Sequence, residues 1–200
     1  AAGASAGTYS FTNLTNNNAT HAAAGEAQLS LATFTTANPQ IVKFALTNAP
    51  GLASAVRIIF ADDNAGILAS LNSITNTATV DFNAGSSGAL PGGESVSFVA
   101  DHSLGLTADP PPTQSGINPG ETLEWTYVLS GSNTLADLDA AMNTGAIRFG
   151  LHLIGLPNNG SEGFVTGSNP PGDPNLIPTP MAGMMGAAGL GIIGARRRRN

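Results

Sequence analysis

The 200-residue chain has no cysteine and unusually few charged side chains. The absence of cysteine excludes disulfide bonds, a thiolate nucleophile and a cysteine-ligated zinc site. Charged residues make up 10% of the chain, well below the quarter or so that is usual for a soluble domain. Together with 25 glycines and 13 prolines, this composition excludes a coiled coil or a long helical bundle. We therefore expect one domain with tails.

Positive charge is scarcest in the body of the chain. Four of the seven basic residues are Arg196, Arg197, Arg198 and Arg199, which leaves 3 cations against 13 acidic residues, a net charge of −10, when that run is set aside. An acidic body repels a phosphate backbone, so we expect no nucleic-acid partner.

Residues that commonly carry catalysis are also few. Asp101, His102 and Ser103 are consecutive, and neighbouring side chains of a strand point to opposite faces, so they cannot form a Ser-His-Asp triad by themselves. His152 lies in an apolar run that is typical of a structural histidine within a sheet. The sequence has no His-x-x-x-His pair. We predict that the chain is not an enzyme and needs no cofactor.

One short acidic segment resembles part of a calcium-binding loop. Asp62, Asp63 and Asn64 supply side-chain oxygens just before Gly66, as calcium loops do. The position of the bidentate glutamate in such a loop is occupied by Asn72. A tight turn in which these side chains bond their own backbone explains the same residues, so calcium is one of two hypotheses here.

Short runs with alternating or continuous apolar character predict strands, each bounded by Gly, Pro, Asn or Asp. Their spacing predicts an all-β domain at residues 7–166, an antiparallel β-sandwich or jelly roll. The first two runs, separated by an Asn-Pro turn, are expected to form a hairpin. The predicted strands cover residues 28–35, 41–46, 55–61, 77–82, 94–100, 122–129 and 146–154.

A single short helix is predicted after residue 134. Thr134 fits an N-cap with Asp137 three positions later, and Gly145 fits the end of the helix. Leu138 and Met142 then share one apolar stripe, so we expect this helix to close one end of the sandwich.

Aromatic residues make up 6% of the chain, and two of them suggest a binding surface. Trp125 and Tyr127 share one face of a predicted strand, because side chains alternate with period two. If that face is open, the two rings form a platform for a sugar. If it faces inward, they belong to the core.

The end of the chain has three successive parts. Residues 167–180 are rich in proline and fit a stalk, residues 181–195 carry no charge, and four arginines follow. This order resembles a PEP-CTERM sorting signal, which bacterial exosortases recognise and process. Pro178 and Pro180 match its two prolines, whereas Thr179 stands where the signal has glutamate.

The resemblance implies an exported protein of the cell surface or extracellular matrix of a Gram-negative-type bacterium. It also implies an exosortase partner and a transient membrane contact through an apolar helix at residues 181–195. Ala4, Ser5 and Ala6 fit the small-residue pattern before a signal-peptidase cut, so residues 1–6 are the end of a signal peptide or a flexible start.

The body is similar to a group of exosortase-dependent surface proteins. The segments that carry this similarity lie at residues 12–18, 25–29, 60–63, 118–121, 147–152 and 160–165. The resemblance implies a location and a fold, and it implies no enzymatic activity.

Two classes of function follow. The first is a structural or interaction protein that forms a homopolymer, with residues 8–14 as a strand donated to a neighbouring copy and the C-terminal helix as a second contact. The alternative for that segment is pairing within its own sheet. The second class is a module that binds extracellular polysaccharide through Trp125 and Tyr127.

Overall fold

The computed structural model describes residues 5–167, with side chains from residue 7 onward, and this part of the chain is all-β with antiparallel pairing throughout. The predicted stalk, the apolar helix and the four arginines lie outside the described residues. No helix between residues 5 and 167 has the length and apolar character needed to cross a membrane.

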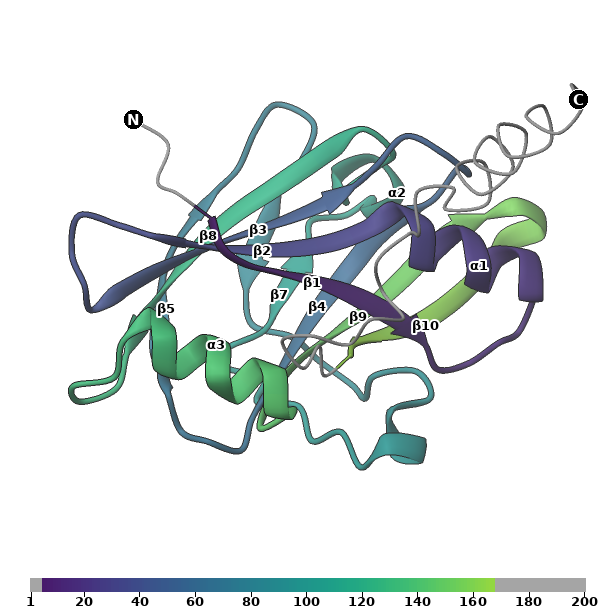
Figure 1. Cartoon of the computed structure of the whole chain (residues 1–200). Coiled ribbons are helices and arrows are strands. Elements are labelled where there is room, and N and C mark those ends of the chain that lie inside the picture. Colours follow the sequence, from purple (N-terminus) through teal and green to yellow (C-terminus); the bar gives the residue numbers. More distant parts are fainter. Residues whose placement is uncertain (1–4, 168–200) are drawn as a thin grey trace, which may run out of the picture. The chain divides into compact units, whose positions relative to one another are not determined.

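Ten strands form the sheet, and short helices connect some of them (Figure 1). The strands are β1 (Ser5–Asn13), β2 (Leu29–Thr35), β3 (Ile41–Asn48), β4 (Ala55–Asp63), β5 (Leu68–Thr75), β6 (Phe82–Ala84), β7 (Leu106–Ala108), β8 (Glu121–Leu129), β9 (Ile147–Leu156) and β10 (Gly160–Thr166). The α-helices are α1 (Ala19–Gln28), α2 (Pro112–Ser115) and α3 (Leu135–Thr144), and the 3₁₀ turns are η1 (Gly93–Val96) and η2 (Pro157–Asn159).

The strand order is β5-β8-β3-β2-β1-β10-β9-β4-β7-β6, and β1 joins two halves of the sheet. Up to Ser10, β1 pairs with β2, and from Phe11 it pairs with β10. We call β5, β8, β3, β2 and the start of β1 the first half, and the end of β1 with β10, β9, β4, β7 and β6 the second half. The single sheet is therefore folded in two at β1, the strand that its two halves share.

The two halves face each other across an aromatic core. The Phe44 ring of β3 lies 5.5 Å from Trp125 and 5.1 Å from Phe149, measured between ring centroids. Phe149 belongs to β9, so the contact crosses from the first half to the second. All three rings are completely buried. Aromatic pairs at such distances add to the large apolar area that they bury.

The far edges of the two halves also meet. The Asn76 amide, directly after β5, accepts a hydrogen bond from the Phe82 N–H at 3.0 Å and donates one to the Phe82 carbonyl at 3.0 Å. A side chain thus replaces the backbone pairing that would join β5 to β6. The ten-stranded sheet is nearly closed.

Helix α3 is confirmed together with its predicted ends. Thr134 and Asp137 form a capping box, and Gly145 ends the helix in the left-handed conformation at φ 76°. Leu138 and Met142 point into the core. Asp139, the residue after Leu138, accepts hydrogen bonds from the Tyr9 hydroxyl at 2.8 Å and from the Thr33 hydroxyl at 3.0 Å. The helix is therefore fixed to the first half by polar contacts and to the core by its apolar stripe.

The predicted hairpin at residues 28–46 is confirmed as β2 and β3, and the predictions for β4, β8 and β9 are also confirmed within a few residues. The strand prediction for residues 77–82 is wrong. The Thr77 N–H donates to the Val80 carbonyl at 2.8 Å, and the Thr77 hydroxyl accepts from the Val80 N–H at 3.1 Å. These bonds close a tight turn, so β6 begins only at Phe82.

The strand prediction for residues 94–100 is also wrong. This segment belongs to a long connection at residues 85–105, which we call the covering loop, between β6 and β7. The carbonyl oxygens of Val96 and Ser97 accept hydrogen bonds from Arg148 instead of from a neighbouring strand, and Ser97 is left-handed at φ 51°. The apolar alternation that suggested a strand comes from Phe98 and Ala100, which pack on the second half.

The segment proposed as a donated strand lies inside its own sheet. Residues 8–13 pair with β2 and β10, and the Leu14 N–H donates to the Gly163 carbonyl at 2.8 Å. The described fold therefore has the alternative arrangement, pairing within the chain.

Candidate interaction surface

The two aromatic residues expected to bind a sugar lie in the core. Trp125 and Tyr127 do share one face of β8, but that face points inward and both side chains are completely buried. The Tyr127 hydroxyl donates to the Leu104 carbonyl, and burial raises its pKa. No ligand can stack on these rings in this fold. The aromatic platform is therefore corrected to a core cluster, because the alternation fixes which residues share a face but not which face is open.

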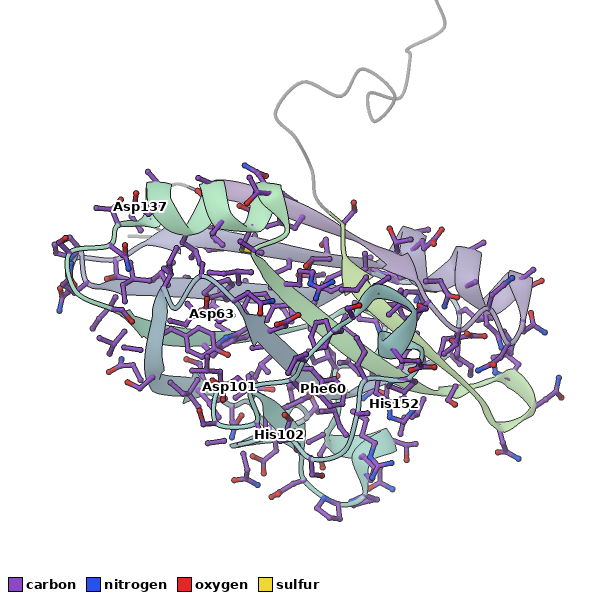
Figure 2. The ribbon with its side chains drawn as sticks, turned by 90° about the horizontal axis from the view of Figure 1, so that it is seen from below. Phe60, Asp63, Asp101, His102, Asp137 and His152 are labelled. Carbon is purple, nitrogen blue, oxygen red and sulfur yellow. The ribbon has the colours of Figure 1, made fainter. Side chains whose placement is uncertain are left out.

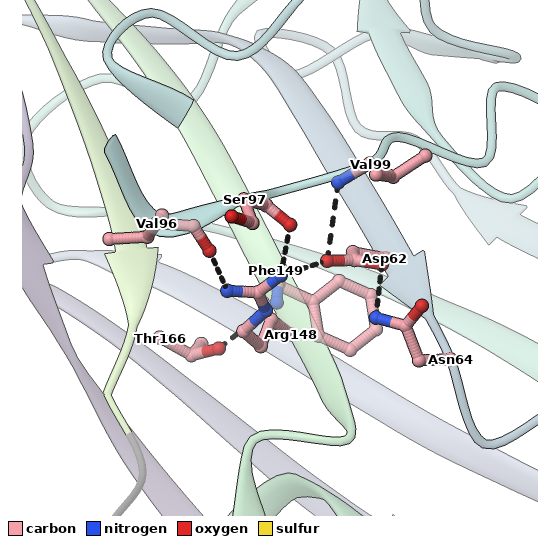
Figure 3. A network of polar contacts seen from close by, with 8 residues as sticks. All are labelled: Asp62, Asn64, Val96, Ser97, Val99, Arg148, Phe149 and Thr166. Atoms are coloured by element: carbon pink, nitrogen blue, oxygen red, sulfur yellow. Dashed lines mark hydrogen bonds and ion pairs between the residues drawn. The ribbon is translucent and has the colours of Figure 1, made fainter. Parts of the chain in front are cut away.

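The acidic segment expected to hold calcium is engaged by protein donors (Figure 3). The Asp62 carboxylate forms an ion pair with the Arg148 guanidinium and accepts from the Asn64 amide at 2.8 Å and the Val99 N–H at 3.3 Å. The Asp63 carboxylate accepts from two backbone N–H groups of the following turn, at 3.3 and 2.7 Å. Within residues 7–167 no three acidic or histidine side chains group as metal ligands. These contacts favour the turn over the calcium site.

Arg148 anchors the covering loop to the second half. Its guanidinium donates to the Val96 carbonyl at 2.7 Å and the Ser97 carbonyl at 2.9 Å, and it lies 5.3 Å from the Phe98 ring centroid. The Asp62 side chain that neutralises it is 2% exposed. The arginine therefore joins three points of the loop to the buried carboxylate of β4.

Under the covering loop lies a second, smaller apolar cluster. It is built on the outer side of the second half, where Ile58, Phe60 and Val165 are buried against Leu90 of the loop. A Cβ atom added at Gly163 would lie 2.0 Å from the Pro91 carbonyl oxygen, so only glycine allows the loop backbone to approach this closely. Around Ile58, Phe60 and Val165 this half of the sheet is therefore buried on both sides.

His102 lies in the covering loop and His152 on β9, and Figure 2 labels both together with Asp63, Asp101 and Asp137. The Asp101 carboxylate accepts from Ser103, at 2.7 Å from its hydroxyl and 3.0 Å from its N–H, and the exposed His102 ring lies 3.2 Å from the Ser86 hydroxyl. His152 lies on β9, where burial, with a smaller effect of Arg57, lowers its pKa. No Ser-His-Asp arrangement follows from these contacts.

A buried carboxylate, which the sequence did not single out by itself, joins residues 13–18 to β10. Glu162 of β10 is 1% exposed and accepts from the Thr15 hydroxyl and from the N–H groups of Asn17 at 3.1 Å and Asn18 at 2.9 Å. Its burial raises the pKa, but the hydrogen bonds outweigh that effect and hold the pKa below its usual value. These bonds fix the connection between β1 and α1.

The outer side of the first half differs from everything described so far. It presents short hydroxyl and methyl side chains in rows across five strands, and we call it the hydroxyl face. Its residues are Thr8 and Ser10 of β1; Ser30, Ala32 and Phe34 of β2; Ile41, Lys43, Ala45 and Thr47 of β3; Thr122, Glu124, Thr126 and Val128 of β8; and Asn72, Ser73 and Thr75 of β5.

Neighbouring strands align these residues in register. Ser10 is opposite Ser30, Ser30 is opposite Thr47, and Thr47 is opposite Thr122. The Thr47 and Thr122 hydroxyls lie 2.9 Å apart. Since neighbouring strands in a sheet are about 4.8 Å apart, the rows form a regular lattice of short side chains.

One ion pair is the charged feature of the hydroxyl face. The Lys43 ammonium lies 2.9 Å from a Glu124 carboxylate oxygen, and 4.8 Å from the centroid of the Phe34 ring. The Lys43 and Glu124 side chains are 26% and 41% exposed, so the pair is open to water. The face as a whole carries no net charge.

A pocket of about 340 Å³ lies beside the turn between β2 and β3 and the start of α3. Its walls are mainly apolar, from residues such as Ile41, Val42, Leu129 and Leu135, and three threonines also line it. No titratable side chain lines it. The pocket therefore has room for a small molecule but no titratable side chain that could act on one.

No protein-family model, no curated protein and no solved structure matches this chain.

Proposed function

We propose that this chain is a structural or interaction protein of the bacterial cell surface or extracellular matrix, and not an enzyme. The observation that carries the proposal is the hydroxyl face, an open and charge-balanced sheet surface on a strongly acidic domain. A broad surface of short side chains suits contact with another extended surface. It does not suit the enclosure of a small substrate, which concave pockets with convergent polar groups provide.

The engagement of the buried ionic groups supports the non-enzymatic part of the proposal. Asp62 and Arg148 hold the covering loop, and Glu162 holds the connection that follows β1. Groups that work in catalysis must reach a substrate, and the lowered pKa of Glu162 comes from the hydrogen bonds of a structural network, which is a known alternative to an active site. These three side chains act on the fold.

The proposed location rests on the sequence of the tail. Pro178, Thr179 and Pro180, the apolar residues 181–195 and the four terminal arginines give the order of an exosortase-processed sorting signal. In this proposal the chain contacts the membrane through the apolar segment only until it is sorted. The fold is proposed to be of the jelly-roll kind, for which the antiparallel pairing of strands distant in sequence, such as β3 with β8 and β4 with β9, is the support.

Replacing Arg196, Arg197, Arg198 and Arg199 by glutamine in the producing bacterium tests the location. The charges after an apolar segment hold it with its end on the cytoplasmic side, so the variant is expected to lose retention and C-terminal trimming. Cell fractionation and mass spectrometry of the C-terminus measure both. A variant that is trimmed and displayed like the unaltered chain contradicts the sorting proposal.

A further inference from the structure

We propose that the hydroxyl face is the surface through which two copies of this chain associate, face to face about a two-fold axis. The inference rests on the proposed function and names the partner of the same surface. It replaces donation of a strand as the route to self-assembly. Strand β1 already pairs within its own chain, with β2 up to Ser10 and with β10 from Phe11.

The polar groups of the hydroxyl face largely satisfy one another. The Thr47 and Thr122 hydroxyls are 2.9 Å apart, the Ser73 and Thr126 hydroxyls are 2.7 Å apart, and the Asn72 amide donates to Thr126 at 3.0 Å. Removing already bonded hydroxyls from water costs less free energy than removing free ones. A polysaccharide is recognised through free donors and acceptors, so a second surface of the same kind fits better.

Charge also favours this face as the meeting surface. Acidic copies repel one another, and the repulsion is weakest where the net charge is zero. The exposed carboxylates of Glu26, Glu94 and Asp137 lie on α1, η1 and α3, outside the five strands that form the hydroxyl face. Two copies that meet through the hydroxyl face keep these charges apart.

The ion pair is complementary to a second copy of itself. Lys43 on β3 and Glu124 on β8 lie on adjacent strands of the first half. A two-fold axis that runs between the two side chains, parallel to the sheet, brings each Lys43 opposite the partner's Glu124. The four charges then alternate in sign. Two-fold symmetric contacts require such self-complementarity.

The size of the face determines the strength of the contact. Five strands about 4.8 Å apart and three rows of side chains cover on the order of 500 Å² per copy. Two copies then bury on the order of 1,000 Å², the lower limit of specific protein interfaces. We therefore expect weak and reversible association that becomes strong only when many copies are held close together.

Opposite charge reversals test the contact. Lys43→Glu gives the face two negative charges, and Glu124→Lys gives it two positive charges. Sedimentation velocity of the full 200-residue chains at low salt is expected to show association of the unaltered protein and at least about tenfold weaker association of each variant alone. An equimolar mixture of the two variants is expected to restore association, because a negative face then meets a positive one.

Matched reversals elsewhere serve as controls. Arg57→Glu on β4 and Glu94→Lys on η1 make the same charge changes at exposed positions away from the hydroxyl face, and they are expected to associate like the unaltered chain. Unaltered thermal unfolding of the four variants shows that the fold is kept.

Three results would overturn the inference. They are an unaltered chain that stays monomeric at millimolar concentration, a mixture that remains dissociated, and controls that weaken association as much as the face variants. Binding of a neutral polysaccharide to a chain that does not self-associate would replace the second copy with a carbohydrate. A chain that associates as described but is not exported contradicts the proposed location alone.

Discussion

The two outer faces of the doubled sheet are both formed by antiparallel strands, but they differ in their exposure to solvent. The second half buries Ile58 and Phe60 beneath the covering loop, whereas the first half leaves a lattice of hydroxyl and methyl groups open. Each face has one ion pair. Asp62 and Arg148 are 2% and 18% exposed, while Glu124 and Lys43 are 41% and 26% exposed. The comparison shows that the second half stabilises its outer face with its own loop, whereas the first half leaves its outer face exposed, and this exposed face is the one we propose for contact.

The largest effect is expected from removing one partner of each ion pair. Asp62→Ala leaves the Arg148 guanidinium without its counter-charge beneath the loop, which typically costs about 3–4 kcal/mol of unfolding free energy. Glu124→Ala breaks an exposed pair, which is worth about 1 kcal/mol or less. Urea unfolding of both variants measures the difference. Equal losses would remove the distinction between the two faces.

The next largest effect is expected where the loop backbone approaches the sheet. The Cβ of Gly163→Ala meets the Pro91 carbonyl, so the loop must shift, at a cost of about 2–3 kcal/mol. Ala32→Val adds carbon to the hydroxyl face, where nothing covers it, and is expected to change stability by less than about 0.5 kcal/mol. Thermal unfolding compares the two. A tolerated alanine at Gly163 would show that the loop is loosely held.

A smaller, pH-dependent effect is expected at Glu162. Its pKa is lowered in the folded chain, so its contribution to stability is complete above the usual carboxyl value and is lost as the pH falls through the lowered value. Glu162→Gln is expected to cost about 2 kcal/mol at pH 7, because backbone donors lose a charged acceptor, and to flatten the acid branch of the stability curve. Urea unfolding between pH 3 and 7 measures both. An unchanged acid branch would assign the pH dependence to other carboxyls.

The smallest effect is expected within the hydroxyl face. Replacing both Thr47 and Thr122 by valine removes a hydroxyl pair and leaves no orphaned partner, so stability is expected to change by no more than about 0.5 kcal/mol. Chemical denaturation checks this value. A loss above about 2 kcal/mol would mean that the hydroxyl rows hold the fold together.

The far edges of the sheet are protected although the body of the chain has few cations. Strand β5 has two register shifts in its pairing with β8, and β6 has only three residues. Bulges and short edge strands both hinder pairing with another chain. The edges are therefore protected by geometry, which charge counting cannot detect.

The sequence by itself determined those features that depend on neighbouring residues, namely the positions of several strands and the ends of one helix. Alternation of apolar residues located β2, β3, β4, β8 and β9, and Thr134, Asp137 and Gly145 marked both ends of α3, because strand period and helix capping act over a few residues. Only the tertiary structure decided that Trp125 points inward, that Asp62 forms an ion pair with Arg148, and that Phe98 belongs to a covering loop. Each of these depends on a contact with a residue distant in the chain, and local patterns carry no information about which distant residue makes that contact.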